Sequence, residues 1–311
     1  MRQYLTARIT FAAITLFILV SVVFFLLRAA PGGPFDSERR LPPEIEANLL
    51  AAYHLDAPLL EQYVRYLGKL AQGDLGPSFK QKDFSVNELI AAGLPVSLKL
   101  GASALILALV IGTLIGIPAG LHPGSKLDFI LMGTSNLNIA IPTIVSAPLL
   151  ILFFSVSLNW FPAGGSGTWQ HFILPSIALS LPYAAAIARL LRGSIAETNL
   201  EPFVRTAHAK GIGTPRIIFH HLLPSASIPI ISYLGPTAAG LLTGSVVVEQ
   251  IFDLPGIGRY FVQGALSRDY TLVMGVVIVY ASTIVLFNLL VDLSYGLVDP
   301  RIRRQQTETL T

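Results

Sequence analysis

Long uncharged apolar stretches alternate with shorter polar segments along the whole chain. A helix needs about 20 mainly apolar residues to cross the hydrocarbon core of a bilayer. Six stretches without Asp, Glu, Lys or Arg approach or exceed that length, at residues 9–27, 100–121, 130–156, 172–188, 222–248 and 271–291. The loop residues 159–167, rich in Gly, separate the third stretch from the fourth. The pattern predicts an all-α polytopic membrane protein with six transmembrane helices.

The first stretch has one feature of a secretory signal peptide, because Arg2 and Arg8 precede an apolar run. However, the run is longer than the apolar core of a signal peptide, and Arg28 occupies the region of the expected cleavage site. We therefore expect this stretch to remain in the protein as a span.

The distribution of Lys and Arg predicts the orientation, since short cytoplasmic loops carry an excess of both. Both termini and the segment 189–221 are basic, with Arg2, Arg8, Arg189, Arg192, Arg205, Lys210, Arg216, Arg301, Arg303 and Arg304. The short loop 249–270, on the opposite side, has only Arg259 and Arg268. Six spans place the three basic segments on one side, so both termini are expected in the cytoplasm.

Composition agrees with a membrane protein: 53% of the residues are apolar, 13% are charged, and the mean hydropathy is +0.65. The formal net charge of +3 gives no sign of a nucleic-acid partner, and membrane lipid is the expected surrounding. The absence of cysteine excludes disulfides, thiolate metal sites and a cysteine nucleophile.

The long loop 31–98 is predicted to be helical. Pro42-Pro43 can start one helix that ends near Leu55, and apolar residues from Leu59 to Leu70 at helical spacing predict a second, amphipathic helix. Ser85 and Glu88 form a capping-box pattern that predicts a short helix ending near Leu94-Pro95. The region is either an external cap packed on the spans or a docking surface for an external partner.

The cytoplasmic segment 202–224 carries the most information. Pro202 and Thr214-Pro215 favour two short helices, with Gly211 and Gly213 in the turn between them. Phe203, Ala207 and Gly211 are spaced by four residues and are expected to share one face. Such a face suits either an interfacial helix on lipid headgroups or the close approach of a partner protein.

Two groups of residues stand out within the spans. Gly112, Gly116 and Gly120, and also Gly240 and Gly244, recur every four residues, which favours close helix packing over a role in the substrate path. Three polar residues either hydrogen-bond between helices or line an aqueous path: Asn136, Asn138 and Asn288.

The six stretches contain no ionisable residue of the kind that ion-coupled carriers usually need. The sequence also lacks the phosphate-binding G-x-x-x-x-G-K-[ST] and the H-E-x-x-H patterns. We therefore predict no catalytic, cofactor-binding or metal-binding residues. If the protein moves a solute uphill, another subunit must supply the energy.

The segment 205–224 resembles the "EAA" loop of ABC importer permeases, E-A-A-x3-G-x9-I-x-L-P. Ala207, Gly211, Leu223 and Pro224 match this pattern, whereas Arg205, Thr206 and His221 depart from it. The sequence R-T-A-x-A-K-G is the form typical of the peptide-transporting branch. Further resemblance to oligopeptide permeases of the B type extends over nearly the whole chain, at residues 27–35, 41–44, 53–55, 73–80, 254–258, 268–270 and 299–303.

The resemblance implies a type I ABC importer fold in the inner membrane of a bacterium. It implies four further protein subunits: a homologous C-type permease, two ATPase subunits that bind ATP and Mg²⁺, and an external peptide-binding protein. Segment 202–224 would then be the loop that couples ATPase motion to the spans, through Phe203, Arg205, Thr206, Ala207, Gly211, Leu223 and Pro224. The permease itself would need no cofactor and catalyse no reaction.

Our interpretation is a permease subunit of an ATP-driven oligopeptide importer. Residues 1–98 would form the first span and the external region, 99–299 the permease domain, and 300–311 a cytoplasmic tail. The alternative within the superfamily is an importer of dipeptides, nickel or another small solute. The alternative from a different class is a membrane scaffold or receptor without transport activity.

Overall fold

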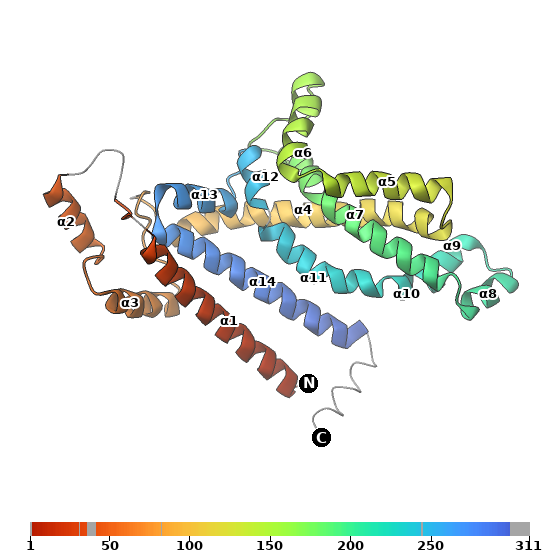
Figure 1. The fold of residues 1–311 in the computed structure, drawn as a ribbon, viewed down its shortest axis with the longest axis horizontal. Helices are drawn as coiled ribbons and strands as arrows, with labels where there is room; N and C mark the ends of the chain where they lie inside the picture. The colour runs from red at the N-terminus through yellow and green to blue at the C-terminus, as the bar shows by residue number, and fades with distance from the viewer. Residues whose placement is uncertain (1, 31, 36–41, 82, 244, 299–311) are drawn as a thin grey trace. The chain divides into compact units, whose positions relative to one another are not determined.

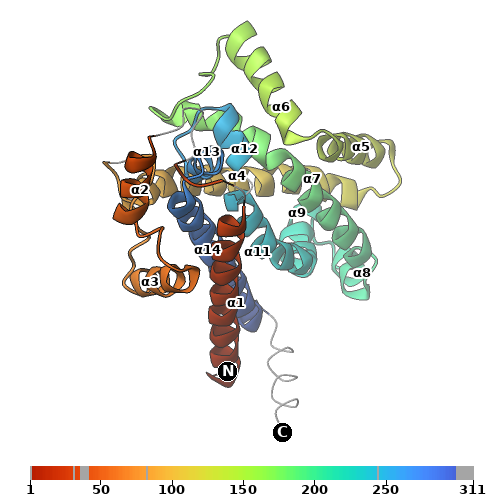
Figure 2. The same cartoon turned by 60° about the vertical axis from the view of Figure 1, so that its left-hand side comes forward.

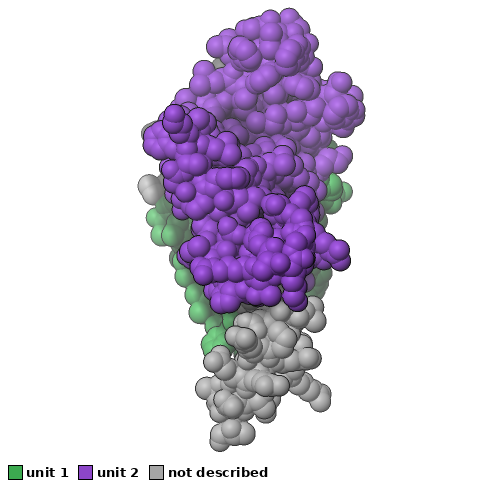
Figure 3. All heavy atoms as spheres, turned by 90° about the vertical axis from the view of Figure 1, so that its right-hand side faces the viewer, with its two compact units in different colours: residues 1–97, 255–283 green, residues 98–254, 284–311 purple. Residues whose placement is uncertain are grey.

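The computed structural model describes residues 2–30, 32–35, 42–81, 83–243 and 245–298. Helices dominate these residues (Figure 1), and the only β-pairing among them is an isolated bridge between Pro77 and Ser85. The contacts divide the chain into two compact units, coloured separately in Figure 3. Unit 1 comprises residues 1–97 and 255–283, and unit 2 comprises residues 98–254 and 284–311. The chain boundaries expected between an external region, a permease domain and a tail remain a prediction.

Helices occupy all six stretches predicted to be spans, and five of these stretches contain a single helix long enough to cross a membrane. In the described part of the chain, five helical stretches are long and apolar enough to cross a membrane: Thr6–Ala29, Val86–Leu121, Trp169–Thr198, Ile228–Ile251 and Tyr270–Leu290. The sixth candidate is a pair, Lys126–Ala140 and Thr143–Ser157, bent by 103°. The bend falls at Pro142. The residue before it, Ile141, is extended, because the helical conformation is disfavoured for a residue that precedes proline.

Unit 1 contains the region that the sequence predicts to be external. Its elements are α1 (Arg2–Ala29), α2 (Pro43–Ala52), α3 (Leu59–Ala71), α13 (Ile257–Ser267) and the first parts of α4 (Val86–Leu121) and α14 (Tyr270–Val298). The predicted amphipathic helix is α3, and it packs against α1, as both views show (Figure 2). Tyr63 and Tyr66 on α3 surround the fully buried Phe24 of α1.

The capping box at the start of α4 is confirmed, but the predicted end of that helix is wrong. The amide and hydroxyl of Ser85 each donate to the Glu88 carboxylate at 2.8 Å, and the amide of Glu88 donates back at 3.3 Å. The helix continues through Pro95 to Leu121. Packing against the start of α13 supports the continuation, because the Ile257 amide donates to the Ser97 hydroxyl at 3.0 Å.

A buried carboxylate joins two distant segments of unit 1. Asp269 is fully buried and accepts hydrogen bonds from the Ser78 hydroxyl at 2.5 Å and the Phe79 amide at 3.0 Å. Its second oxygen accepts from the Thr271 hydroxyl at 3.0 Å and from the Leu272 amide at 3.2 Å, at the start of α14. The carboxylate therefore holds the loop around residues 78–80 against the beginning of the last span.

Unit 2 contains the remaining helices. These are the rest of α4 and α14, α5 (Lys126–Ala140), α6 (Thr143–Leu150), a π-helical segment (Ile151–Ser157), a 3₁₀ turn (Trp169–Phe172), α7 (Ile173–Thr198), α8 (Pro202–Ala209), α9 (Thr214–Ile217), a π-helical turn (Ile218–Leu222), α10 (Leu223–Ala226), α11 (Ile228–Thr243) and α12 (Ser245–Ile251). Helix α7 is the most buried of them, and α5 lies along it (Figure 1).

The glycine repeat of α4 packs as its spacing predicts. A Cβ atom added to Gly112, Gly116 or Gly120 would lie 2.8 Å from a carbonyl oxygen of α7, those of Ala184, Ala188 and Arg192 respectively. The two backbones therefore approach too closely for any side chain at these three positions. Gly240 likewise faces the Tyr183 side chain, at 2.9 Å, whereas Gly244 lies outside the described residues.

Candidate coupling segment and membrane path

The segment 202–224 folds as two short helices that pack on α7. Pro202 begins α8, whose residues Val204 and Ala207 are buried among Ile187, Leu191 and other apolar residues of unit 2. In Figures 1 and 2, α8 and α9 lie at the carboxyl end of α7. The predicted pair of helices is thus present.

Gly211 ends the first helix in a left-handed conformation, with φ of +73°. The Gly211 amide donates to the His208 carbonyl at 2.9 Å, and the Ile212 amide donates to the Ala207 carbonyl at 3.2 Å. These two bonds form the Schellman arrangement that glycine favours at this position. A Cβ atom on Gly211 would contact nothing within 4 Å, so this chain leaves the space beside it open.

The expectation of an exposed Phe203–Ala207–Gly211 face is wrong at its centre. Phe203 is 45% exposed, whereas Ala207 is only 4% exposed. The reason is the turn itself, because it brings Ile212 back over the apolar cluster that covers Ala207. Ala207 therefore anchors the segment to α7, and the exposed surface of the segment lies elsewhere.

The exposed surface of the segment is aromatic and basic. Of the predicted coupling residues, Arg205, Thr206 and Pro224 are exposed, and Leu223 is half-buried against α7. Phe219 is 66% exposed, and the sequence reasoning did not select it. The ring of Phe203 lies 6.5 Å from that of His221, so α8 contacts the π-helical turn that follows α9 on this side. Such a surface suits a partner protein with an apolar pocket and acidic surroundings.

The three asparagines proposed for the path do not form one site. Asn136 lines a hollow of about 530 Å³ between α5 and α7, together with Arg189, Arg192, Phe129 and other residues. Asn138 and Asn288 are not part of its lining, and among the described residues no hydrogen bond connects the three asparagines. Their role in a translocation path stays a prediction.

An ion pair that the sequence reasoning missed lies in the same hollow. Arg192 on α7 donates from Nη2 at 2.6 Å and from Nε at 3.2 Å to the two carboxylate oxygens of Asp128 on α5. The side chain of Asp128 is only 6% exposed, and the Gly124 amide also donates to it, at 2.9 Å. Asp128 adjoins the third apolar stretch, so a search for uncharged sequence alone excluded it.

A second missed charge is Glu249. It is fully buried near the end of α12, where the Ser245 hydroxyl donates to its carboxylate at 2.6 Å. The candidate helical spans are longer than the uncharged stretches and include both Asp128 and Glu249, so the helices carry ionisable groups that the stretches as drawn leave out. Within the described residues, no group of three or more His, Cys, Asp or Glu side chains could hold a metal ion.

Two solved structures share this fold. One is described as an amino acid ABC transporter with histidines, with a TM-score of 0.52, 19% identity, and coverage of 67% of this chain and 92% of that one. The other is the MetNI methionine ABC transporter in an inward-facing conformation, with a TM-score of 0.53, 21% identity, and coverage of 68% and 96%. The fold is therefore that of the membrane-spanning subunits of type I ABC transporters.

The chain belongs to the family of binding-protein-dependent transport system inner membrane components, whose model matches residues 112–304. It is 49% identical to the oligopeptide transport system permease protein OppB of Haemophilus influenzae over 97% of this chain and 100% of that protein. The OppB of Salmonella typhimurium gives the same identity and coverage. The dipeptide transport system permease protein DppB of Bacillus subtilis is 41% identical over 97% of this chain and 98% of that protein. The chain is thus a permease subunit of an ABC transporter in the inner membrane.

Proposed function

We propose that this chain is the permease subunit of an importer for oligopeptides. The observation that carries the proposal is the 49% identity to OppB proteins over their whole length. The similarity includes the external helices as well as the core spans, so it is not limited to the general transporter fold. A scaffold or receptor without transport activity is disfavoured by the family and by the coupling-loop pattern at residues 205–224.

The proposed mechanism assigns the work of ATP to partner subunits. A homologous C-type permease would complete the path, two ATPase subunits would bind the exposed surface of segment 202–224, and an external protein would deliver the peptide. Because Val204 and Ala207 fix this segment to α7, a push on α8 would move α7 rather than deform the turn. The permease itself would require no cofactor. Both termini would lie in the cytoplasm.

A dipeptide importer is the second candidate, because DppB of Bacillus subtilis is 41% identical over nearly the whole chain. The test is uptake in an amino-acid auxotroph whose own copy of this permease is deleted. Plasmid-borne permease should restore growth on a tetrapeptide or pentapeptide that contains the required amino acid. Growth restored by dipeptides alone would favour the second candidate, and growth restored by neither would refute peptide import.

A further inference from the structure

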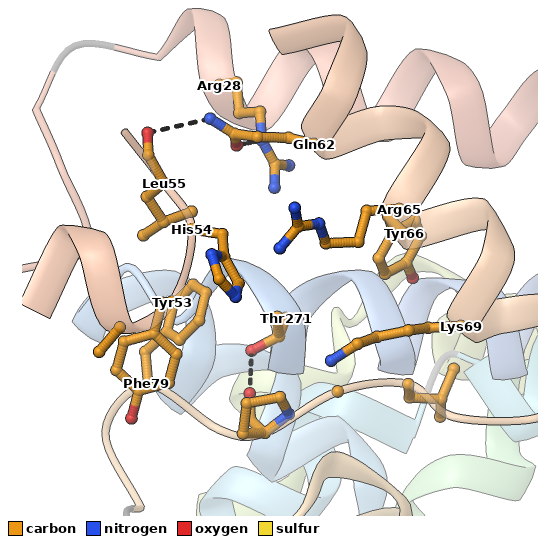
Figure 4. Close-up of a pocket in the computed structure, with 14 residues that line it drawn as sticks. Arg28, Tyr53, His54, Leu55, Gln62, Arg65, Tyr66, Lys69, Phe79 and Thr271 are labelled. Atoms are coloured by element: carbon orange, nitrogen blue, oxygen red, sulfur yellow. Dashed lines mark hydrogen bonds between the residues drawn. The ribbon is translucent and has the colours of Figure 1, made fainter. Parts of the chain in front are cut away.

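A basic pocket of about 210 Å³ lies within unit 1, between α1, α3, the start of α14 and the loops around residues 54 and 76. Figure 4 shows Arg28, Arg65 and His54 directed into one space, with Lys69 extending from α3 toward Thr271. No Asp or Glu side chain is among the lining residues that the structure describes. The walls are partly aromatic, with Tyr53, Tyr66 and Phe79. Nothing in the coupling mechanism requires this cluster of cations.

Contacts within the unit orient Arg28 but do not neutralise it. Its Nε donates to the Gln62 side-chain oxygen at 3.0 Å, and its guanidinium lies 3.5 Å from the centroid of the Phe24 ring. Gln62 is itself fixed, since its nitrogen donates to the carbonyls of Leu55 and Ala57, each at 2.9 Å. Within the described residues, no carboxylate forms an ion pair with Arg28 or Lys69. Arg65 pairs with Glu61 at 3.0 Å, but both side chains are exposed.

The position of the pocket along α1 places it at the level of lipid headgroups. Tyr63 on α3 reaches the hydroxyl of Ser21 at 2.6 Å, while the neighbouring Gln62 reaches Arg28 in the last turn of α1. Seven residues of helix separate these two contacts, which corresponds to about 10 Å along the span. One edge of α3 therefore faces the middle of the membrane, and the other edge faces the end of the span.

One edge of α3 is apolar and the other is basic, as expected for a helix at this depth. Leu60 and Val64, which follow the edge toward the membrane, are 69% and 61% exposed. Arg65 and Lys69 follow the opposite edge, above the pocket. An amphipathic helix with this arrangement lies in the membrane interface. The Tyr66 phenol adds no anion to the pocket, because an ordinary phenol is uncharged at physiological pH and burial by the surrounding helices raises its pKa further.

We propose that this pocket binds the phosphate group of an anionic phospholipid headgroup. Guanidinium groups match the geometry of phosphate oxygens, and the ammonium of Lys69 adds a flexible point charge. A phosphodiester at the end of a transmembrane helix already lies at the depth of Arg28, with its acyl chains free to run along Phe25, which is 43% exposed and lies beside Tyr63 of α3. The bound lipid would hold α3 against α1 and so fix the external helices on the membrane. The proposal requires neither the peptide substrate nor a particular membrane orientation.

The test uses the full-length chain in nanodiscs of phosphatidylcholine, with and without phosphatidylglycerol, followed by native mass spectrometry of the retained lipid. The wild-type chain should retain phosphatidylglycerol in preference to phosphatidylcholine. Lys69→Gln should weaken that retention about fivefold, the effect of removing one basic side chain at an anionic membrane surface. Arg28→Lys keeps the charge but loses the planar fork, and it should also weaken retention. Lys80→Gln is the matched control, because Lys80 is an exposed lysine of the same unit outside the pocket.

Each outcome decides for or against a lipid site. Loss of preference in Lys69→Gln but not in Lys80→Gln, with unchanged thermal stability in phosphatidylcholine, would support the proposal. Equal effects of the two substitutions would mean that the lipid preference comes from the general surface charge and not from the pocket, and would overturn the proposal. Displacement of phosphatidylglycerol by millimolar inorganic phosphate would identify a free-phosphate site instead. A lipid preference that appears only when the external binding protein is present would indicate that the basic residues bind that protein, and would overturn the proposal.

Discussion

Gly211 combines a required backbone conformation with open space at its side. A residue other than glycine at φ of +73° costs about 1–2 kcal/mol, and this chain places nothing near the missing side chain. Gly211→Leu should therefore insert normally into the membrane but lose most peptide uptake, because it distorts the turn and projects into the space of a partner. Uptake of labelled peptide at matched permease abundance measures this effect.

Gly213 provides the control for that experiment. It has φ of −63° and equally open surroundings, so leucine is accepted there without backbone strain. Gly213→Leu should retain more uptake than Gly211→Leu. Normal uptake by Gly211→Leu would contradict the coupling role of the segment.

Asp269 is the second residue whose substitution has a defined cost. Its two carboxylate oxygens accept hydrogen bonds from the loop 78–80 and from the first turn of α14. In Asp269→Asn one acceptor becomes a donor that faces other donors, so the stability of unit 1 should fall by about 1.5–3 kcal/mol. A thermal unfolding curve in detergent should show a lower midpoint. Asp56→Asn, an exposed carboxylate of the same unit, should leave it unchanged.

At the scale of elements, the sequence predicted best where one physical rule acts alone. Apolar length identified the helices that are candidate spans, the Ser85–Glu88 pattern identified the start of α4, and glycine spacing identified a close helix contact. The end of α2, predicted near Leu55 and found at Ala52, was also close.

Predictions failed where tertiary contacts override a local rule, and where a predicted span ended at its first charged residue. Pro95 does not end α4, because the start of α13 packs against α4 near that residue. Ala207 is buried because the turn after it folds Ile212 back onto α7, and periodicity within α8 cannot show this. Asp128 and Glu249 were missed because each uncharged stretch was ended at its first charged residue, whereas the helix continues past that residue. The basic pocket joins residues 28, 54, 65 and 69, which no spacing rule brings together.

The contact between α4 and α7 gives a sharp test at this scale. Even the single methyl group of Gly116→Ala would lie 2.8 Å from the Ala188 carbonyl oxygen and 2.9 Å from the Leu191 side chain. The helices must separate to accept it, and such overpacking costs about 1–3 kcal/mol. The variant should unfold at a lower temperature in detergent. Gly133→Ala, in α5 with nothing within 4 Å, should be neutral or slightly stabilising, and equal behaviour of the two variants would refute the close contact.

At the scale of the whole molecule, the number of spans depends on whether the bent pair α5 and α6 crosses the membrane. Pro142 and the extended Ile141 break this stretch by 103°, a geometry that fits either a broken span or a re-entrant loop. The two topologies differ in the side on which every later segment lies. They also decide whether the basic segment 189–221 and the N-terminus lie on the same side of the membrane. The predicted cytoplasmic placement of both termini depends on that.

Because the chain has no cysteine, three exposed lysines can report the topology one at a time as Lys80→Cys, Lys126→Cys and Lys210→Cys. Helix α4 separates Lys80 from Lys126, so these two positions must label from opposite sides in either topology and serve as an internal reference. The bent pair and α7 separate Lys126 from Lys210. If the pair is one span, both positions lie on the same side, and an impermeant thiol reagent should reach them only after the inner membrane is opened. Labelling of Lys210→Cys together with Lys80→Cys in cells with a permeable outer membrane would make the pair re-entrant and refute six spans. Labelling of Lys126→Cys and Lys210→Cys, but not Lys80→Cys, in those cells would keep six spans and reverse the orientation.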